Sequence, residues 1–435
     1  QFRIGRVLIS GNTKTHEKVI RRELYTRPGD FFSRQAIIRS VRQLSQLNYF
    51  NPEKIRPDTR ITDEKNVDLE YSVEEKSSDT FNMSVGYSGA FGFSGGLGLT
   101  FNNFSLSEPL RGGAGQVLNF DWQFGVSYGY RTFTIGFTEP WMFDQPTLFG
   151  INFYDTQYTY PYEVHYTGVT TRIGRRLKWP DYLFRVDWSI LYQRNLYTLP
   201  AGSPYLYPPN PTDTTLSTRQ FGITQVFSRN STDSPLFPSR GSSFSLSTHV
   251  SFGPALPSVA RYHKHVFSAE WYIPLWNSSR VTFMAASTLG MIFGFDRQSL
   301  IPIQDYFRMG GTGLGQFSIT PLRGYEEQSV GSRTVRGALI PGKSMIKQSA
   351  ELRFSLALNP IPIYTLLFAE AGNTWIDHTV QDPLDLKRSA GIGVRLLVNP
   401  IGLIGFDYGY GFDDVLPRDG QPDGWKFHFQ FGRSF

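Results

Sequence analysis

The sequence predicts a mostly β fold, in which a 16-stranded antiparallel transmembrane β-barrel at residues 78–435 follows one small α/β module at residues 1–77. Three observations support this prediction. From residue 81 onward, segments of about ten residues alternate apolar and polar side chains. The connections between these segments alternate between short turns and long loops. Helical periodicity is confined to the first 77 residues, so the chain divides into two parts of different class.

The first part has the element order β-α-α-β-β. The opening "QFRIGRVLIS" alternates as a strand does, and Thr15 is expected to cap a short helix. Ser33 is expected to cap a second helix, because apolar residues with helical spacing follow it; they are Ile37, Val41, Leu44 and Leu47. Strands at "PEKIRPD" and "NVDLEYSVEE" complete the unit. We interpret these residues as a small soluble module.

The strands of the second part have one apolar and one polar face. In "SAELRFSLAL", Ala350, Leu352 and Phe354 lie on one face, and Glu351 and Arg353 lie on the other. A soluble β-sandwich also alternates, because its apolar face packs against a second sheet. Here the polar face carries many small or charged residues, as a water-filled lumen requires. This pattern favours a membrane barrel over a sandwich.

The lengths of the connections orient the barrel. Short turns such as "NPIPI" and "NPIG" alternate with long loops near 198–216, 295–347 and 411–424. Outer-membrane barrels have short periplasmic turns, long extracellular loops and an even number of strands. The first strand, near 80–88, starts on the side of the module, so odd-numbered strands run outward. The loop at about 295–347 joins strands eleven and twelve and is predicted to be extracellular or to fold back into the lumen.

The composition excludes several kinds of function. The chain has no Cys, which excludes disulfides, thiol nucleophiles and Cys-bound metals. A net charge of +6 over 435 residues gives no concentrated surface for nucleic acid. The chain has no apolar run of about 18 residues, and hence no transmembrane helix. We expect no enzyme activity, cofactor or metal site, and we expect His263 and His265 of "HKH" to form a pair in the lumen or a loop.

Four stretches resemble one family of outer-membrane proteins. They are "VLISGNTKTHEKVIRREL" with "LNYF", "NFSLSEPLRGGAG" with "FTEPWMF", "DSPLFPSRG", and "LRGY" at residues 322–325. In this order and at this spacing they resemble the BamA-type assembly factors, in which a polypeptide-transport-associated (POTRA) module precedes a bacterial surface antigen barrel. The resemblance covers essentially the whole chain. "LRGY" is its most specific part and resembles the (V/I)RG(F/Y) element of the family's sixth extracellular loop.

The resemblance implies a role for Arg323. In the family, this arginine packs inside the barrel against acidic residues of nearby strands, for which Glu351 and Glu370 are the candidates here. The family usually has Asp at the second position, and Glu370 is one methylene longer. The alternative is a packing lock without a part in any insertion cycle. The predicted loop-six set is Arg323, Gly324, Tyr325, Glu351, Phe368 and Glu370.

The resemblance also implies a seam between the first strand, "TFNMSVGYSG", and the last, "GWKFHFQFGRSF". Glycine weakens both strands, so the seam is predicted to open as a lateral gate. An open seam exposes two strand edges, with which a client strand pairs by β-augmentation. The predicted seam residues are Phe81, Met83, Val85, Gly86, Phe427, Phe429, Phe431, Gly432 and Phe435.

The function implied by the resemblance is that of the central subunit of the outer-membrane protein assembly machinery. Such a subunit folds and inserts β-barrel proteins through its seam without nucleotide. The implied partners are unfolded outer-membrane clients, accessory assembly lipoproteins at the module, and outer-membrane lipid. The implied location is the bacterial outer membrane, with the module in the periplasm. The alternative is a two-partner secretion pore, or a translocation-and-assembly homologue, that exports a partner protein.

Overall fold

The structure is a computed structural model. It describes residues 2–88, 92–126, 129–159, 163–198, 214–234, 238–254, 256, 258–276, 280–296, 299–312, 319–334, 337, 339–357, 362–377, 382–398, 402–415 and 422–431. It divides into two compact units. One contains Gln1–Phe81, Gly98–Phe120 and Ile135–Ile151, and the other contains Asn82–Leu97, Asp121–Thr134 and Asn152–Phe435. The predicted domain boundaries, 1–77 and 78–435, remain a prediction.

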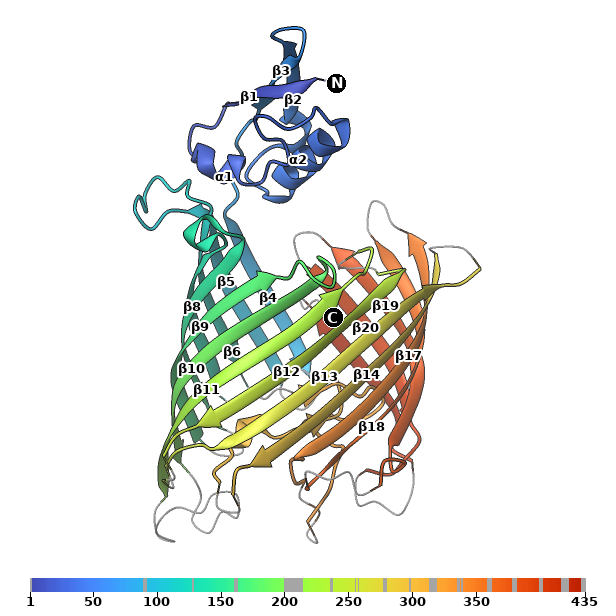
Figure 1. Cartoon of the computed structure of the whole chain (residues 1–435). Helices are drawn as coiled ribbons and strands as arrows, with labels where there is room; N and C mark the ends of the chain where they lie inside the picture. The colour runs from blue at the N-terminus through green and yellow to red at the C-terminus, as the bar shows by residue number, and fades with distance from the viewer. Residues whose placement is uncertain are drawn as a thin grey trace. The chain divides into compact units, whose positions relative to one another are not determined.

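The N-terminal module is a three-stranded sheet with two helices on one side (Figure 1). Its elements are β1 (Arg3–Ser10), α1 (Glu17–Arg21), α2 (Arg34–Gln46), the 3-10 helix η1 (Pro52–Lys54), β2 (Arg56–Ile61) and β3 (Asn66–Ser72). β3 lies in the middle, parallel to β1 and antiparallel to β2. The predicted order β-α-α-β-β is therefore confirmed.

The apolar stripes of the sequence form the core of this module. Ile37 and Leu44 of α2 are buried against residues of α1, β1 and β3. The predicted cap of α2 is confirmed, since the Ser33 hydroxyl accepts a hydrogen bond from the Ala36 amide at 3.3 Å.

The predicted cap of α1 is wrong. The helix begins at Glu17, after His16, and no side chain caps it. Thr15 is buried instead, and its hydroxyl accepts a hydrogen bond from Asn103 Nδ2 at 2.8 Å. The Thr15 amide donates to Glu75 Oε1 at 2.6 Å. A residue with two such distant partners is not available as a local cap.

The barrel is a single antiparallel sheet of 16 strands, so the predicted fold class is confirmed. The strands are β4 (Thr80–Ser88), β5 (Gly92–Phe104), β6 (Gln116–Gly125), β7 (Tyr130–Glu139), β8 (Thr147–Tyr158), β9 (Glu163–Arg176), β10 (Phe184–Thr198), β11 (Thr215–Asn230), β12 (Gly241–Phe252), β13 (Tyr262–Pro274), β14 (Val281–Gly294), β17 (Ser344–Ala357), β18 (Ile363–Trp375), β19 (Lys387–Val398), β20 (Gly402–Gly411) and β21 (Gly424–Phe431). The order runs from β4 to β21 as in the chain, so that β4 and β21 are the two end strands of the sheet.

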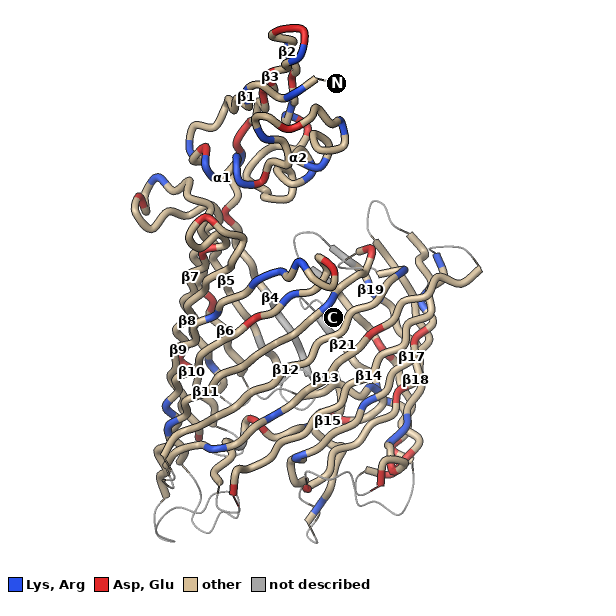
Figure 2. Tube along the Cα trace, viewed as in Figure 1, with Lys and Arg blue, Asp and Glu red and all other residues tan. Residues whose placement is uncertain are grey.

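Short elements lie in the connections. The 3-10 helix η2 (Met142–Asp144) joins β7 and β8, while η3 (Ile303–Asp305), β15 (Arg308–Met309) and β16 (Ile319–Thr320) lie between β14 and β17. The strands β8 to β14 run side by side in the wall (Figure 1). Charged residues are dense along the module and sparse along the middle of most barrel strands (Figure 2). No helix within the described part of the chain is long and apolar enough to span a membrane.

The connection between β14 and β17 is called loop six below (residues 295–343), and apolar residues of its described part pack inside the barrel. Its apolar residues Ile301, Phe307, Met309 and Leu322 are buried in one cluster with residues of β13, β14 and β17. Polar contacts fix its first half: Asp305 accepts a hydrogen bond from the Tyr262 hydroxyl at 2.7 Å through its carboxylate, and one from Lys264 Nζ at 2.6 Å through its carbonyl. Loop six therefore folds into the lumen, which confirms the second of the two predicted positions, extracellular or folded back into the lumen.

The same contacts correct the prediction for His263 and His265. Tyr262 and Lys264 face the lumen, so the alternation of β13 points the two histidines outward, in a strand rather than in the lumen or a loop. The rings are hydrogen-bonded to each other, with Nδ1 of His263 2.8 Å from Nε2 of His265. His263 also stacks on Phe293, with 4.9 Å between ring centroids. Mutual hydrogen bonding and stacking explain how two imidazoles are accommodated on the outer face.

Candidate functional site: the loop-six cluster

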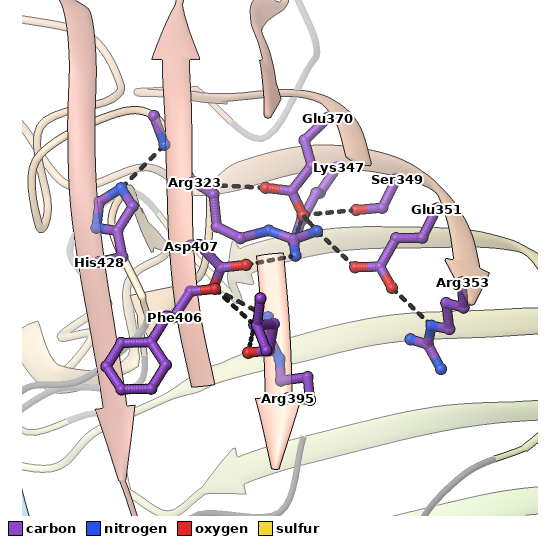
Figure 3. Close-up of polar contacts among 12 residues, drawn as sticks. Arg323, Lys347, Ser349, Glu351, Arg353, Glu370, Arg395, Phe406, Asp407 and His428 are labelled. Atoms are coloured by element: carbon purple, nitrogen blue, oxygen red, sulfur yellow. Dashed lines mark hydrogen bonds and ion pairs between the residues drawn. The ribbon is translucent and has the colours of Figure 1, made fainter. Parts of the chain in front are cut away.

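Arg323 of loop six is the centre of a buried polar cluster on the inner wall (Figure 3). Its Nη2 donates to Glu351 Oε1 at 2.6 Å and to Glu370 Oε1 at 2.8 Å, and its backbone amide donates to Glu370 Oε2 at 2.8 Å. Nη1 lies 3.4 Å from Asp407 Oδ1. The side chain of Arg323 is 7% exposed. One arginine thus binds carboxylates from three strands, β17, β18 and β20.

Each of these carboxylates has a second cationic partner. Glu351 accepts a hydrogen bond from Arg353 Nε at 2.7 Å, Glu370 lies 3.2 Å from Lys347 Nζ, and Asp407 lies 2.9 Å from Arg395 Nη2. The four cations are Arg323, Lys347, Arg353 and Arg395. Burial of a charge is unfavourable unless partners neutralise it and satisfy its hydrogen bonds. The charges of four cations and three carboxylates nearly cancel. Each charged group therefore depends on its neighbours for neutralisation, and the loss of one member destabilises the others.

Gly324 brings the backbone of loop six against the wall. Its φ is +90°, a conformation that strongly favours glycine. A Cβ at this position would lie 2.9 Å from Ser389 Cβ and 3.1 Å from the Gly411 amide nitrogen. The Gly324 amide donates to His428 Nε2 at 3.0 Å. Because His428 belongs to β21, this hydrogen bond connects loop six with an end strand of the sheet.

Tyr325 and Phe368 complete the predicted set. Tyr325 is fully buried, and its hydroxyl donates to the Arg388 carbonyl at 2.5 Å. The Phe368 ring lies beneath the Arg323 guanidinium, whose carbon is 3.9 Å from the ring centroid. A cation over an aromatic face gains electrostatic attraction. All six residues of the predicted loop-six set therefore lie in one cluster.

The sequence prediction missed Asp407 and His428. Both lie on the lumen side of their strands, opposite the outward-facing Phe406 and Phe427. The alternation of "IGFDYGYG" and "WKFHFQFG" shows that both side chains face the lumen. Their position along the barrel wall cannot be read from the sequence, because it depends on the register of β20 and β21 with the strands before them. Alternation therefore identifies lumen-facing residues, and the register decides which of them reach Arg323.

The predicted seam residues lie on the two end strands of the sheet. Phe81 and Met83 are exposed on β4, which also contains Val85 and Gly86. Phe427, Phe429 and Phe431 lie on β21; Phe427 is exposed, and Phe429 packs on Phe406, with 5.1 Å between ring centroids. Gly432 and Phe435 lie outside the described residues.

The arrangement of the loop-six cluster supports binding and shape control rather than covalent chemistry. A cavity of about 390 Å³ borders the cluster and is lined by Tyr272, Pro321 and Tyr364 among others. Within the described ranges, no group of three or more His, Asp or Glu has the geometry of a metal site.

Two domain families match this chain. The POTRA description, "surface antigen variable number repeat", matches residues 2–76, and the Omp85 superfamily domain matches residues 111–435. The outer membrane protein assembly factor BamA of Neisseria meningitidis serogroup B is 25% identical over 480 residues, which cover 99% of this chain and 56% of that protein. The BamA of Nitratidesulfovibrio vulgaris is 26% identical over 447 residues, which cover 99% and 51%. The chain thus spans about half the length of these relatives.

Solved structures show the same fold. BamA from Haemophilus ducreyi lacking POTRA domains 1–3 has a TM-score of 0.76 at 18% identity, with 99% of this chain and 84% of that chain covered. CdiB from Acinetobacter baumannii has a TM-score of 0.60 at 14% identity, with 99% of this chain and 73% of that chain covered. Since the Omp85 superfamily domain alone accounts for most of its residues, the chain belongs to the Omp85 superfamily.

Proposed function

We propose that this chain, a barrel with a periplasmic module, belongs to the central subunit that folds β-barrel proteins and inserts them into the outer membrane. The likeness to BamA assembly factors along essentially the whole chain supports the proposal. One structural observation carries it: Arg323 and Gly324 connect loop six to β20 and to the end strand β21. The protein resides in the bacterial outer membrane with its N-terminal module in the periplasm.

The proposed mechanism needs no nucleotide. When the seam between β4 and β21 opens, each strand presents unpaired N–H and C=O groups at membrane depth. A client strand that pairs with such an edge satisfies its own backbone groups before it leaves water. Folding of the client then supplies the free energy. The role of loop six is to hold β17 to β21 in shape while β21 exchanges partners.

We propose the module as the site for accessory assembly lipoproteins. β2 is one of the two outer strands of the three-stranded sheet, and all six of its residues are exposed. An exposed edge strand is a surface to which another chain adds a strand. Unfolded outer-membrane proteins are the proposed clients of the barrel, while outer-membrane lipid surrounds it.

The proposal is tested by reconstituting the 435-residue chain in liposomes. An unrelated barrel protein is unfolded in urea, diluted into the liposomes, and its folding is followed by heat-modified gel mobility. We expect faster folding than in empty liposomes. A heat-inactivated sample of the same proteoliposomes controls for bilayer defects. If the two preparations give the same rate, the insertase proposal for this chain is wrong.

The alternative function is export of one partner protein through the lumen, as in a two-partner secretion pore or a translocation-and-assembly homologue. The likeness to CdiB has the lower TM-score of the two described above, and at 14% identity it concerns the fold alone. Transport of a protein across the proteoliposome membrane, without faster folding of the barrel client, would favour this alternative.

A further inference from the structure

Two arginines face each other on the outer wall of the barrel. Arg194 of β10 and Arg219 of β11 are directly opposite in the ladder. Both side chains are exposed. In the part of the chain that the structure describes, neither guanidinium has a hydrogen bond or an ion pair. Opposed residues of neighbouring strands have Cβ atoms about 5 Å apart, and like charges at this distance destabilise a sheet.

The neighbours of these arginines establish which way they point. Tyr197 of β10 donates to Gln304 of loop six at 3.1 Å, and Gln220 of β11 donates to Tyr262 at 2.7 Å. Tyr197 and Gln220 therefore face the lumen. Side chains alternate along a strand, so Arg194 and Arg219 face away from the lumen, toward the membrane.

Along their strands, the two arginines lie at the level of the extracellular membrane–water interface. β10 is the seventh strand of the sheet, and odd-numbered strands run outward, so its C-terminal end is extracellular. Below Arg194, the outward positions are Trp188, Ile190 and Tyr192, all exposed and apolar or aromatic. Tyr192 packs on Phe221 with 4.9 Å between ring centroids. Aromatic side chains of this kind mark the boundary of the apolar band. The arginines lie one outward position beyond Tyr192, about 7 Å along the strand. The next outward residue of β10, Leu196, is exposed and lies opposite Ser217, so polar side chains predominate from the arginines outward.

The backbone at this place is rigidly held. Besides its ladder with β10, Arg219 donates its amide to the Ser258 carbonyl at 2.8 Å and accepts from the Ala260 amide at 3.0 Å. These hydrogen bonds hold Arg219 on the side away from β10, while the β10–β11 ladder keeps Arg194 opposite it. Asp155 of β8, an outward-facing carboxylate two strands away, is already bonded to His165 at 2.7 Å and to Thr167 at 2.8 Å. Among the residues that the structure describes, none neutralises the positive charge of the pair, so an anion from outside the protein can bind there.

We propose that Arg194 and Arg219 together bind the phosphate group of an anionic lipid headgroup in the outer leaflet. Guanidinium groups donate hydrogen bonds in a planar fork that matches phosphate oxygens, and two of them converge here on one anion. A lipid brings its phosphate to this level of the wall, while its chains cover Ile190 and Tyr192 below. An acidic protein would have to reach the same place from within the plane of the membrane, and the site therefore favours a lipid over a protein as its ligand. The site does not depend on the insertase function proposed above.

The test measures lipid selectivity of the 435-residue chain in nanodiscs. The probes are spin-labelled phosphatidic acid and spin-labelled phosphatidylcholine, and the motionally restricted fraction of each is determined. At roughly fivefold per interfacial arginine, we expect a preference for phosphatidic acid of about tenfold or more. In the double variant Arg194→Gln/Arg219→Gln the preference should fall below about twofold. Arg194→Lys/Arg219→Lys should retain only part of it, because the charge remains but the planar fork is lost. Heat-modified gel mobility of both double variants shows that a loss is not caused by misfolding.

Arg261 provides a matched control. It lies at the same end of the barrel, but its guanidinium is already bonded to Asp296 at 3.0 Å. Arg261→Gln should leave the preference unchanged. An unchanged preference in the Arg194→Gln/Arg219→Gln variant overturns the proposal. So does loss of the preference in the presence of millimolar inorganic phosphate, because the pair would then be a site for free anions rather than for lipid.

Discussion

At the scale of single residues, the structure depends most on Arg323. Lysine cannot replace it, because one ammonium group cannot donate in parallel to carboxylates on three strands. Its removal leaves Glu351, Glu370 and Asp407 with one cation fewer in a buried site.

We expect Arg323→Ala to destabilise the barrel by about 3–5 kcal/mol, as when one partner of a buried ion pair is removed. The measurement is the temperature at which the folded band disappears in heat-modified gel mobility. Arg388→Ala is the control, since that guanidinium is exposed and forms a surface ion pair with Asp413, a kind of pair that contributes little to stability. Equal transitions for the two variants would show that the cluster does not stabilise the barrel.

Glu75 makes the local stability of the N-terminal module depend on pH. Burial raises the pKa of the Glu75 carboxyl, but hydrogen bonds from Thr13, Thr15 and the Lys14 amide prevail and lower it from 4.5 to about 2. A carboxyl whose pKa is lowered on folding stabilises the folded state above its unfolded pKa, and the stabilisation is lost as the pH falls toward the folded value.

We therefore expect the amides of residues 13–15 to lose hydrogen-exchange protection between about pH 4.5 and pH 2. Exchange rates are corrected for the intrinsic effect of pH. Glu75→Gln should show reduced protection already at pH 6 and little further change on acidification. A variant that retains the pH dependence of the wild type would assign it to another group.

At the scale of elements, the sequence allowed the alternation of most strands to be predicted, but not the register between them. The pairing of Arg323 with Glu351 and Glu370 could be predicted because parity and the resemblance to the family agree. Asp407 and His428 could not, because their height on the wall follows from ladders between distant segments. The outward direction of His263 was missed for a related reason: a polar residue near a strand end is acceptable on either face.

Gly324 tests how closely loop six must approach the wall. We expect Gly324→Ala to displace the loop and break the hydrogen bond to His428, since φ is +90° and the added Cβ collides with Ser389. Limited proteolysis within loop six measures the displacement. Gly424→Ala is the matched control, because φ is +78° there and nothing lies within 4 Å of the added Cβ. Resistance to protease in both variants would mean that loop six tolerates a wider gap.

At the scale of the whole molecule, loop six connects to the end strand β21 and so to the predicted seam. The sheet order places β4 and β21 at its two ends, and loop six reaches β21 through Gly324 and His428 at 3.0 Å and through Glu326 and Lys426 at 3.0 Å. A loop with these contacts is suited to hold the last strand while its outer edge accepts a client.

The most direct test is a reversible disulfide across the seam, for example between Cys introduced at Val85 and Phe429. The chain contains no other Cys, so the crosslink is unique. A control crosslink joins Ser189 and Thr224, which are opposite in β10 and β11. In the liposome folding assay, we predict that oxidation of the seam pair abolishes the acceleration of client folding, that reduction restores it, and that the control pair has no effect. Full acceleration with the seam crosslink formed would contradict lateral opening as the mechanism.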